Sequence, residues 1–168
     1  SLYESCRSHL MVELLSPAGS MEALKAAIAG GCDAVYLGGS KFNARAYATN
    51  FNHDELIEAV KLCHLYGVKV YVTVNILYDE SQLDELKAYL CELYDMQVDA
   101  LIVQSEGVIS YILKHFKDFE VHASTQCSVH NTDGVLYYQN LGIKRVVCAR
   151  ENSLEEIRQM TSTGTDIE

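Results

Sequence analysis

The stretch Gly31-Cys-Asp-Ala-Val-Tyr-Leu37 joins the end of a helical segment to a short apolar run with the character of a buried strand. A second stretch, Gln97-Val-Asp-Ala-Leu-Ile-Val103, repeats this pattern, with Asp-Ala again placed directly before the apolar run. Segments with helical spacing of their apolar residues separate such runs along the chain. A chain that alternates strands and helices in this way favours a parallel sheet with helices outside it.

The same alternation extends over nearly the whole chain of 168 residues. Apolar runs predict strands at Val12–Leu15, Ala34–Leu37, Val68–Val74, Ala100–Val103, Val121–Ala123 and Arg145–Ala149, and a further strand begins at Asp166. Capping side chains predict helix starts at Ser20, Asn52, Asp79 and Ser153, and glycines such as Gly31 and Gly67 predict helix ends. Two architectures satisfy this order: an open doubly wound sheet, and an incomplete (β/α) barrel.

Composition and charge exclude some classes of protein and favour others. The 13 Lys and Arg residues against 23 Asp and Glu give a net charge of −10, and no basic run is present, so direct nucleic-acid binding by this chain is not expected. No apolar run approaches the ~18 residues that a membrane helix needs. The six cysteines contain no Cys-x-x-Cys pair and mostly accompany apolar segments, which favours a reducing, cytoplasmic location.

Polar side chains follow the predicted strands, at the end of the sheet where α/β enzymes collect their active groups. This rim suits a peptide or a small anionic substrate. Its candidate substrate-binding residues are Arg45, Asn75, Gln104, Ser124, Gln126, Arg150 and Glu151. Arg45 is suited to clamping a carboxylate or phosphate, or else to pinning its own loop. Arg150 has the same two options, because Glu151 beside it offers a local ion pair.

His122 is the candidate catalytic residue, as a general acid or base, because imidazole exchanges protons near neutral pH. The alternative is a buried histidine that only bonds a backbone carbonyl. Cys127 and His130 follow it, but the spacing His-x4-Cys-x2-His matches no standard zinc pattern, and we expect no metal site. The glycine pair Gly38-Gly39 is a weak signal for the approach of a phosphate group.

The motifs, taken together and in order, resemble those of a known family. They are Glu13-Leu-Leu-Ser-Pro-Ala-Gly-Ser20, Gly31-Cys-Asp-Ala-Val-Tyr-Leu-Gly-Gly39, Phe42-Asn-Ala-Arg-Ala-Tyr47, Gly67-Val-Lys-Val-Tyr-Val-Thr-Val-Asn75, Val98-Asp-Ala-Leu-Ile-Val-Gln104, Val121-His-Ala-Ser-Thr-Gln126 and Arg145-Val-Val-Cys-Ala-Arg-Glu151. The chain resembles the N-terminal barrel region of the collagenase-like peptidases, family 32 of the unclassified (U) peptidases.

The resemblance implies a (β/α)8 barrel. The alternation of strands and helices indicates that residues 11–168 supply about six of its units, and we expect residues 1–10 to form an N-terminal extension. It implies a peptidase, a hydrolase acting on protein. The alternative it offers is hydroxylation of tRNA, rRNA or ubiquinone, using prephenate or an iron–sulfur cluster. In the family, the cysteines of a [4Fe-4S] cluster lie beyond the region matched here, so we expect no cofactor in this chain. A third possibility is a non-catalytic assembly partner, and an open barrel edge predicts a homo-oligomer.

Overall fold

The structure is a computed structural model that describes residues 13–39, 51–74, 79–123, 145–146 and 166–167. The elements in chain order are β1 (Leu15–Pro17), α2 (Met21–Ala29), β2 (Ala34–Gly38), α3 (His53–Leu65), β3 (Lys69–Val74), the short 3-10 helix η1 (Glu80–Gln82), α4 (Leu83–Asp95), β4 (Ala100–Val103), α5 (Glu106–His115), β5 (Val121–Ala123), β6 (Arg145–Val146) and β7 (Asp166–Ile167).

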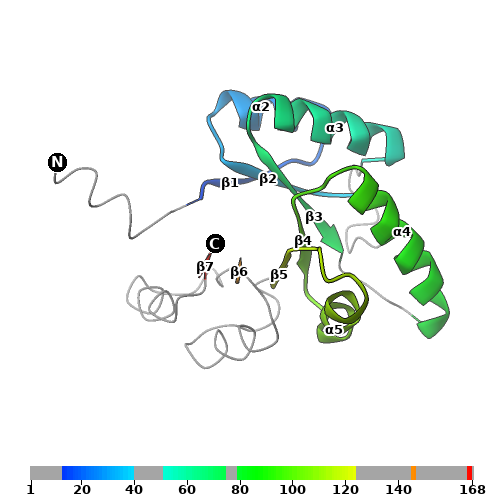
Figure 1. The fold of residues 1–168 in the computed structure, drawn as a ribbon. Helices are drawn as coiled ribbons and strands as arrows, with labels where there is room; N and C mark the ends of the chain where they lie inside the picture. The colour runs from blue at the N-terminus through cyan, green and yellow to red at the C-terminus, as the bar shows by residue number, and fades with distance from the viewer. Residues whose placement is uncertain (1–12, 40–50, 75–78, 124–144, 147–165, 168) are drawn as a thin grey trace.

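The strands form one parallel sheet in the order β1-β2-β3-β4-β5-β6-β7. A doubly wound sheet reverses its strand order at a switch point, whereas a barrel adds each new strand beside the last. The sequential order therefore selects the barrel. Figure 1 shows the strands following a curved row, with α2, α3, α4 and α5 on its outer side. The barrel is incomplete: among the described residues, β1 and β7 are the two edges of the sheet.

Local signals in the sequence explain where two of the helices begin. The Ser20 hydroxyl accepts a hydrogen bond from the backbone N–H of Ala23, with 3.1 Å between Oγ and N. Asn52 forms a reciprocal capping box with Glu55. Both predicted starts are confirmed. The predicted start at Asp79 is early, because Asp79 and Gln82 bracket a turn of 3-10 helix and α4 begins at Leu83.

The first strand also differs from its prediction, since β1 comprises Leu15–Pro17 rather than Val12–Leu15. Proline has no N–H to donate, but an edge strand leaves one side unpaired, so Pro17 is tolerated there. The predicted helix start at Ser153 lies outside the described residues.

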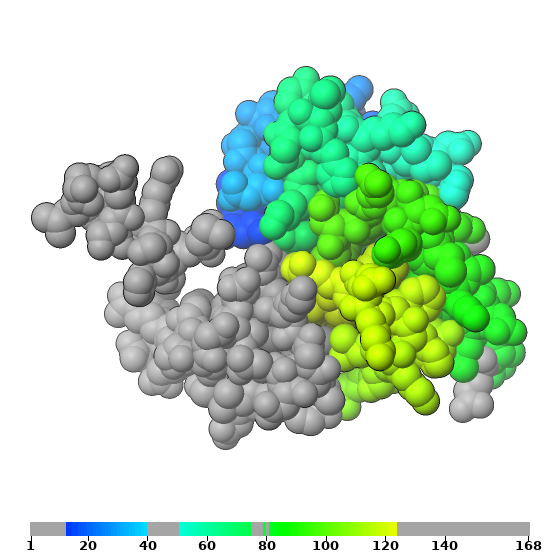
Figure 2. Space-filling view, viewed as in Figure 1, coloured from blue at the N-terminus to red at the C-terminus, as the bar shows by residue number. Residues whose placement is uncertain are grey.

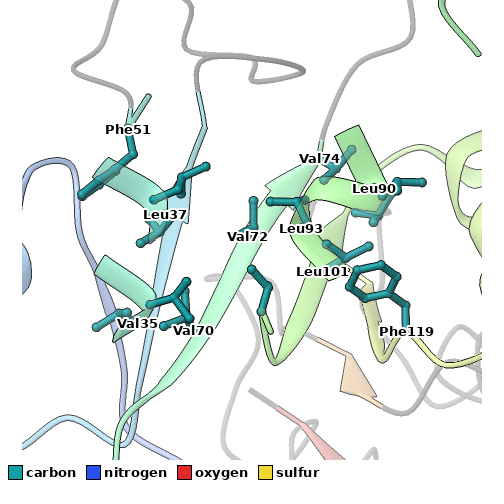
Figure 3. Close-up of a cluster of buried hydrophobic side chains, with 14 of the residues drawn as sticks. Val35, Leu37, Phe51, Val70, Val72, Val74, Leu90, Leu93, Leu101 and Phe119 are labelled. Carbon is teal, nitrogen blue, oxygen red and sulfur yellow. The ribbon is translucent and has the colours of Figure 1, made fainter. Parts of the chain in front are cut away.

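The main hydrophobic core lies between the strands and the helices. Figure 3 shows Leu37 beside Phe51 in one part of this core, and Leu101 beside Phe119 in another. Alternate residues of each strand point into it, which follows from the two-residue period of a strand. Leu90 is fully buried here, and a leucine side chain buried in this way contributes about 1.5–3 kcal/mol. In Figure 2 the segments from α2 to α5 pack against one another without a break.

The opposite face of the same strands carries a second, smaller cluster on the inner side of the curved sheet. Ala34, Tyr71, Ala100 and Ile102 form it, with Leu15 and Tyr36 packed against them. Strands buried on both faces need nearly continuous apolar sequence, as the runs in this chain have. In the part of the chain that is described, no helix has the length and apolarity needed to cross a membrane.

Candidate functional site

Polar groups gather on the inner face of the sheet, around β3 and β5. They are Glu13, Tyr71, Glu120 and His122, which we call the interior cluster. Tyr71 lies on β3 and His122 on β5, while Glu13 and Glu120 precede β1 and β5. The four residues come from distant parts of the sequence, and the parallel sheet brings them together.

His122 is fully buried, with no exposed surface. Its Nε2 atom lies 2.7 Å from Oε1 of Glu120, whose side chain is 37% exposed. The ring packs edge to face against Tyr71, with ring centroids 4.7 Å apart and an interplanar angle of 73°. His122 is therefore held by a carboxylate at one ring nitrogen and by an aromatic ring at its side, a favoured geometry for ring pairs.

Tyr71 is anchored in turn by Glu13. The Tyr71 hydroxyl donates a hydrogen bond of 2.5 Å to Oε1 of Glu13, and Tyr71 is only 1% exposed. The second oxygen of Glu13 lies 4.0 Å from Nζ of Lys69. The Glu13 carboxylate thus connects a buried phenol on one side with an exposed ammonium group on the other.

The position of the cluster along the strands follows from the register. Tyr71 pairs with Ala100, two residues before the position where Ile102 pairs with His122. Glu13 and Glu120 lie before their strands. The cluster therefore occupies the N-terminal half of the sheet and reaches the middle of β5 at His122. Most barrel enzymes place their reacting groups at the opposite, C-terminal end.

The predicted rim is only partly described. Gln104 directly follows β4 and is half-buried, two residues beyond the position that pairs with His122. The other predicted substrate-binding residues lie outside the described residues: Arg45, Asn75, Ser124, Gln126, Arg150 and Glu151. The roles predicted for these residues and for His122 stay predictions. The interior cluster adds Glu120, Tyr71 and Glu13, which are not among the residues predicted from the sequence.

One signal for Glu120 was present in the sequence. Residues two apart on an extended segment share a face, so Glu120 and His122 are placed side by side by spacing alone. The sequence signal for Tyr71 is weaker: it is the one aromatic residue within a run of valines. Glu13 lies 58 positions from Tyr71, and no local pattern connects them.

The glycine pair at the end of β2 has a packing explanation. Gly39 forms a parallel bridge with Phe51, and a Cβ added at Gly39 would collide with the Tyr89 hydroxyl and lie 3.3 Å from Leu56 Cδ1. Burial raises the pKa of the Tyr89 phenol well above its ordinary value. Gly39 therefore has a packing role of its own, and the weak phosphate signal of Gly38-Gly39 stays a prediction.

The iron–sulfur cluster implied by the family resemblance does not fit the described cysteines. Cys32 and Cys63 are buried in the apolar core, and Cys91 is exposed on α4. Burial raises the pKa of Cys63 to about 11, with Cys32 and Asp99 adding to the effect, so its thiol resists becoming the thiolate that iron requires. No group of three metal-binding side chains occurs within the residues described. Cys127 and His130 lie outside them.

The fold and the interior cluster define a (β/α) barrel protein with a buried imidazole. Residues 19–168 match the model of Peptidase family U32. The chain belongs to this family, as its motifs predicted.

Three relatives show the range of the family. The chain is 42% identical over 148 residues to tRNA hydroxylation protein P1 of Bacillus subtilis, covering 88% of this chain and 35% of that protein. It is 36% identical to tRNA hydroxylation protein P of Escherichia coli, covering 93% of this chain and 34% of that protein. It is 33% identical to a collagenase of Porphyromonas gingivalis, covering 90% and 36%. The chain thus spans about a third of the length of these relatives.

Among solved structures, the U32 peptidase Mk0906 superposes with a TM-score of 0.75 at 15% identity, covering 90% of this chain and 65% of that one. At this identity the likeness concerns the fold alone, and it supports the barrel architecture.

Proposed function

We propose that this chain is part of the barrel of a protein that hydroxylates RNA. The observation that carries the proposal is the higher sequence identity to the tRNA hydroxylation proteins than to the collagenase. The family resemblance predicts peptidase activity first and RNA hydroxylation second, and the relatives favour the second. RNA modification also agrees with the cytoplasmic location that the cysteine pattern predicted.

The interior cluster supplies a chemical reason for this choice. His122 is buried beside the partly exposed carboxylate of Glu120, and an imidazole is able to take or return one proton during a reaction on a base. We assign His122 that role, with the predicted rim residues binding the substrate. The net charge of −10 disfavours a grip on phosphates by this chain, so we assign RNA binding to the remainder of the protein.

The test is nucleoside analysis of tRNA from cells that lack the native protein and express it again from a plasmid. We expect hydroxylated nucleosides, heavier by one oxygen atom, to disappear on deletion and to return with the unmodified protein. They should fall strongly with His122→Asn. The matched control is His53→Asn, because His53 is exposed and pairs with Glu92 on the outer surface. Unchanged tRNA on deletion would contradict the proposal.

A second candidate function is the peptidase activity after which the family is named. The similarity to the collagenase favours it. Its test is cleavage of gelatin by the purified protein. Cleavage that is lost in His122→Asn and kept in His53→Asn would support the peptidase. Absence of both activities, together with a stable partner protein in pull-down, would favour the third possibility of an assembly role.

A further inference from the structure

We propose that Glu120 is a positioning residue for His122. In this proposal the Glu120 carboxylate holds the imidazole by Nε2, fixes the proton on that nitrogen, and leaves Nδ1 as the basic nitrogen of the ring. The inference rests on the proposed role of His122, and it adds the residue that makes that role possible.

The geometry of the pair supports this assignment. Glu120 and His122 are two residues apart on an extended segment, so their side chains share the inner face. The contact of 2.7 Å between Nε2 and Oε1 is in the range of a charge-assisted hydrogen bond. An ionised carboxylate only accepts hydrogen bonds, so Nε2 of His122 must carry a hydrogen. Nδ1 then carries the lone pair of the neutral ring, and it is buried.

The neighbours of His122 restrict the ring in other directions. Tyr71 packs edge to face against it, and the Tyr71 hydroxyl is held by Glu13. On the sheet, His122 lies between Ile102 of β4 and the backbone position of Arg145 on β6. The ring is thus held at its far nitrogen by Glu120 and at its side by Tyr71, which is the support that a group needs in order to act in one orientation.

The charge balance of the site also requires Glu120. When Nδ1 takes up a proton, the ring becomes an imidazolium ion inside the barrel, and an unpaired buried charge is strongly unfavourable. The Glu120 carboxylate already lies against the opposite nitrogen and pairs with the new charge. Its side chain is partly exposed, so the carboxylate keeps contact with water while the imidazole does not. Among the described residues, the charged groups Glu13 and Lys69 are joined to this pair through Tyr71.

The direct test is ¹⁵N NMR of the histidine side chains in the labelled full chain. The His122 signals are assigned by their absence from the spectrum of His122→Asn. We expect the neutral form of the His122 ring to show a single tautomer, with the proton on Nε2. Glu120→Gln should keep this tautomer, because the amide oxygen still accepts from Nε2. Glu120→Ala should give a mixture of both tautomers. Glu92→Ala, which removes the partner of His53, is the matched control and should leave His122 unchanged.

The second readout is hydroxylation activity of the protein that carries these substitutions. We expect Glu120→Ala to lower kcat by about 10- to 100-fold with little change in KM, which is the size of loss found when the orienting partner of a metal-bound histidine is removed. Glu120→Gln should restore part of kcat. Circular dichroism checks that each variant is folded. Where Glu120→Ala does not fold, a mixture of both His122 tautomers in the unmodified protein would already overturn the inference.

The outcomes separate this inference from the proposed function. An unchanged His122 tautomer in folded Glu120→Ala would overturn the positioning role, whatever the activity. A shifted tautomer with full hydroxylation would also overturn it, because the reaction would then not depend on the orientation of His122. Absence of hydroxylation in the unmodified protein would refute the proposed function alone, and the tautomer would still decide whether Glu120 orients His122.

Discussion

Oδ2 of Asp99 accepts the backbone N–H of Val70 at 2.7 Å, across the gap between the beginnings of β4 and β3. Oδ2 of Asp33 accepts the N–H of Leu14 at 2.8 Å in the same way, between β2 and β1. Asp33 and Asp99 hold equivalent places in the two repeated stretches of the sequence. The repeat therefore has a structural role, because each aspartate ties the start of its own strand to the start of the preceding one.

Removing the Asp99 carboxylate should destabilise the fold. In Asp99→Ala the Val70 N–H loses its charged acceptor, and His64, whose Nε2 lies 2.8 Å from the same oxygen, loses its partner. We expect the free energy of unfolding to fall by about 1–3 kcal/mol in urea titration. Asp95→Ala, on the exposed surface at the end of α4, should change it by less than about 0.5 kcal/mol. Equal effects of the two substitutions would contradict the role of Asp99.

The end of α4 carries residual strain that a glycine should relieve. Gln97 is exposed and has φ of 64°, whereas the equivalent places after α2 and α3 hold Gly31 and Gly67, with φ of 80° and 70°. We expect Gln97→Gly to raise the thermal midpoint and to stabilise the protein by up to about 1 kcal/mol, since only glycine adopts this conformation without a penalty. Gly67→Ala should have the opposite effect. A destabilised Gln97→Gly would show that the strain is absent.

Gly39→Ala should destabilise the protein by about 1–3 kcal/mol, because the added methyl group meets the Tyr89 hydroxyl. The check is a double-mutant cycle with Tyr89→Phe, which removes that hydroxyl, followed by urea unfolding. We expect the two substitutions to be less than additive, since the second removes the atom with which the first collides. Gly19→Ala is the control, because a Cβ there meets nothing within 4 Å. Additive effects would argue against the contact.

Stability should fall in alkaline solution in part through Cys63. Burial raises the pKa of its thiol from 9.0 to about 11. Between these values the unfolded chain has lost the proton that the folded chain keeps, so the free energy of unfolding decreases as pH rises from about 9 to 11. We expect the slope to be smaller in Cys63→Ala, by at most about 1.4 kcal/mol per pH unit. The control Cys91→Ala, at an exposed thiol, should keep the original slope. An identical slope in Cys63→Ala would exclude this contribution.

Local sequence was enough to predict most of the described elements. Ala100–Val103 and Val121–Ala123 form strands with the predicted bounds, because short apolar runs between turns have few alternatives. The cap at Asn52 is correct for the same reason, since its partner Glu55 is three residues away. Prediction was weaker at β1, where Pro17 depends on being at an edge, and at the end of α4, where Gln97 adopts the left-handed conformation without being a glycine.

The candidate site was likewise predictable only where local sequence determines it. His122 was selected from its chemistry and its place on a predicted strand, whereas its contact with Tyr71 depends on the registers of β3, β4 and β5. Glu13 illustrates the limit, because its bond to Tyr71 joins the beginning of β1 to the inner face of β3. The pairing of strands is determined by the whole sheet, so the sequence near Glu13 or near Tyr71 does not predict this contact.

The sequence by itself determined the alternation of strands and helices, the membership of a family of barrel proteins, and His122 as a residue of interest. These properties depend on residue types and on spacings of a few positions, which act within single elements. Only the tertiary structure decided that the strands follow one another in sequential order, that Asp33 and Asp99 join neighbouring strands, and that Glu120 and Tyr71 hold His122. Those relationships depend on which faces meet when the core excludes water, and this is settled by the packing of the whole domain.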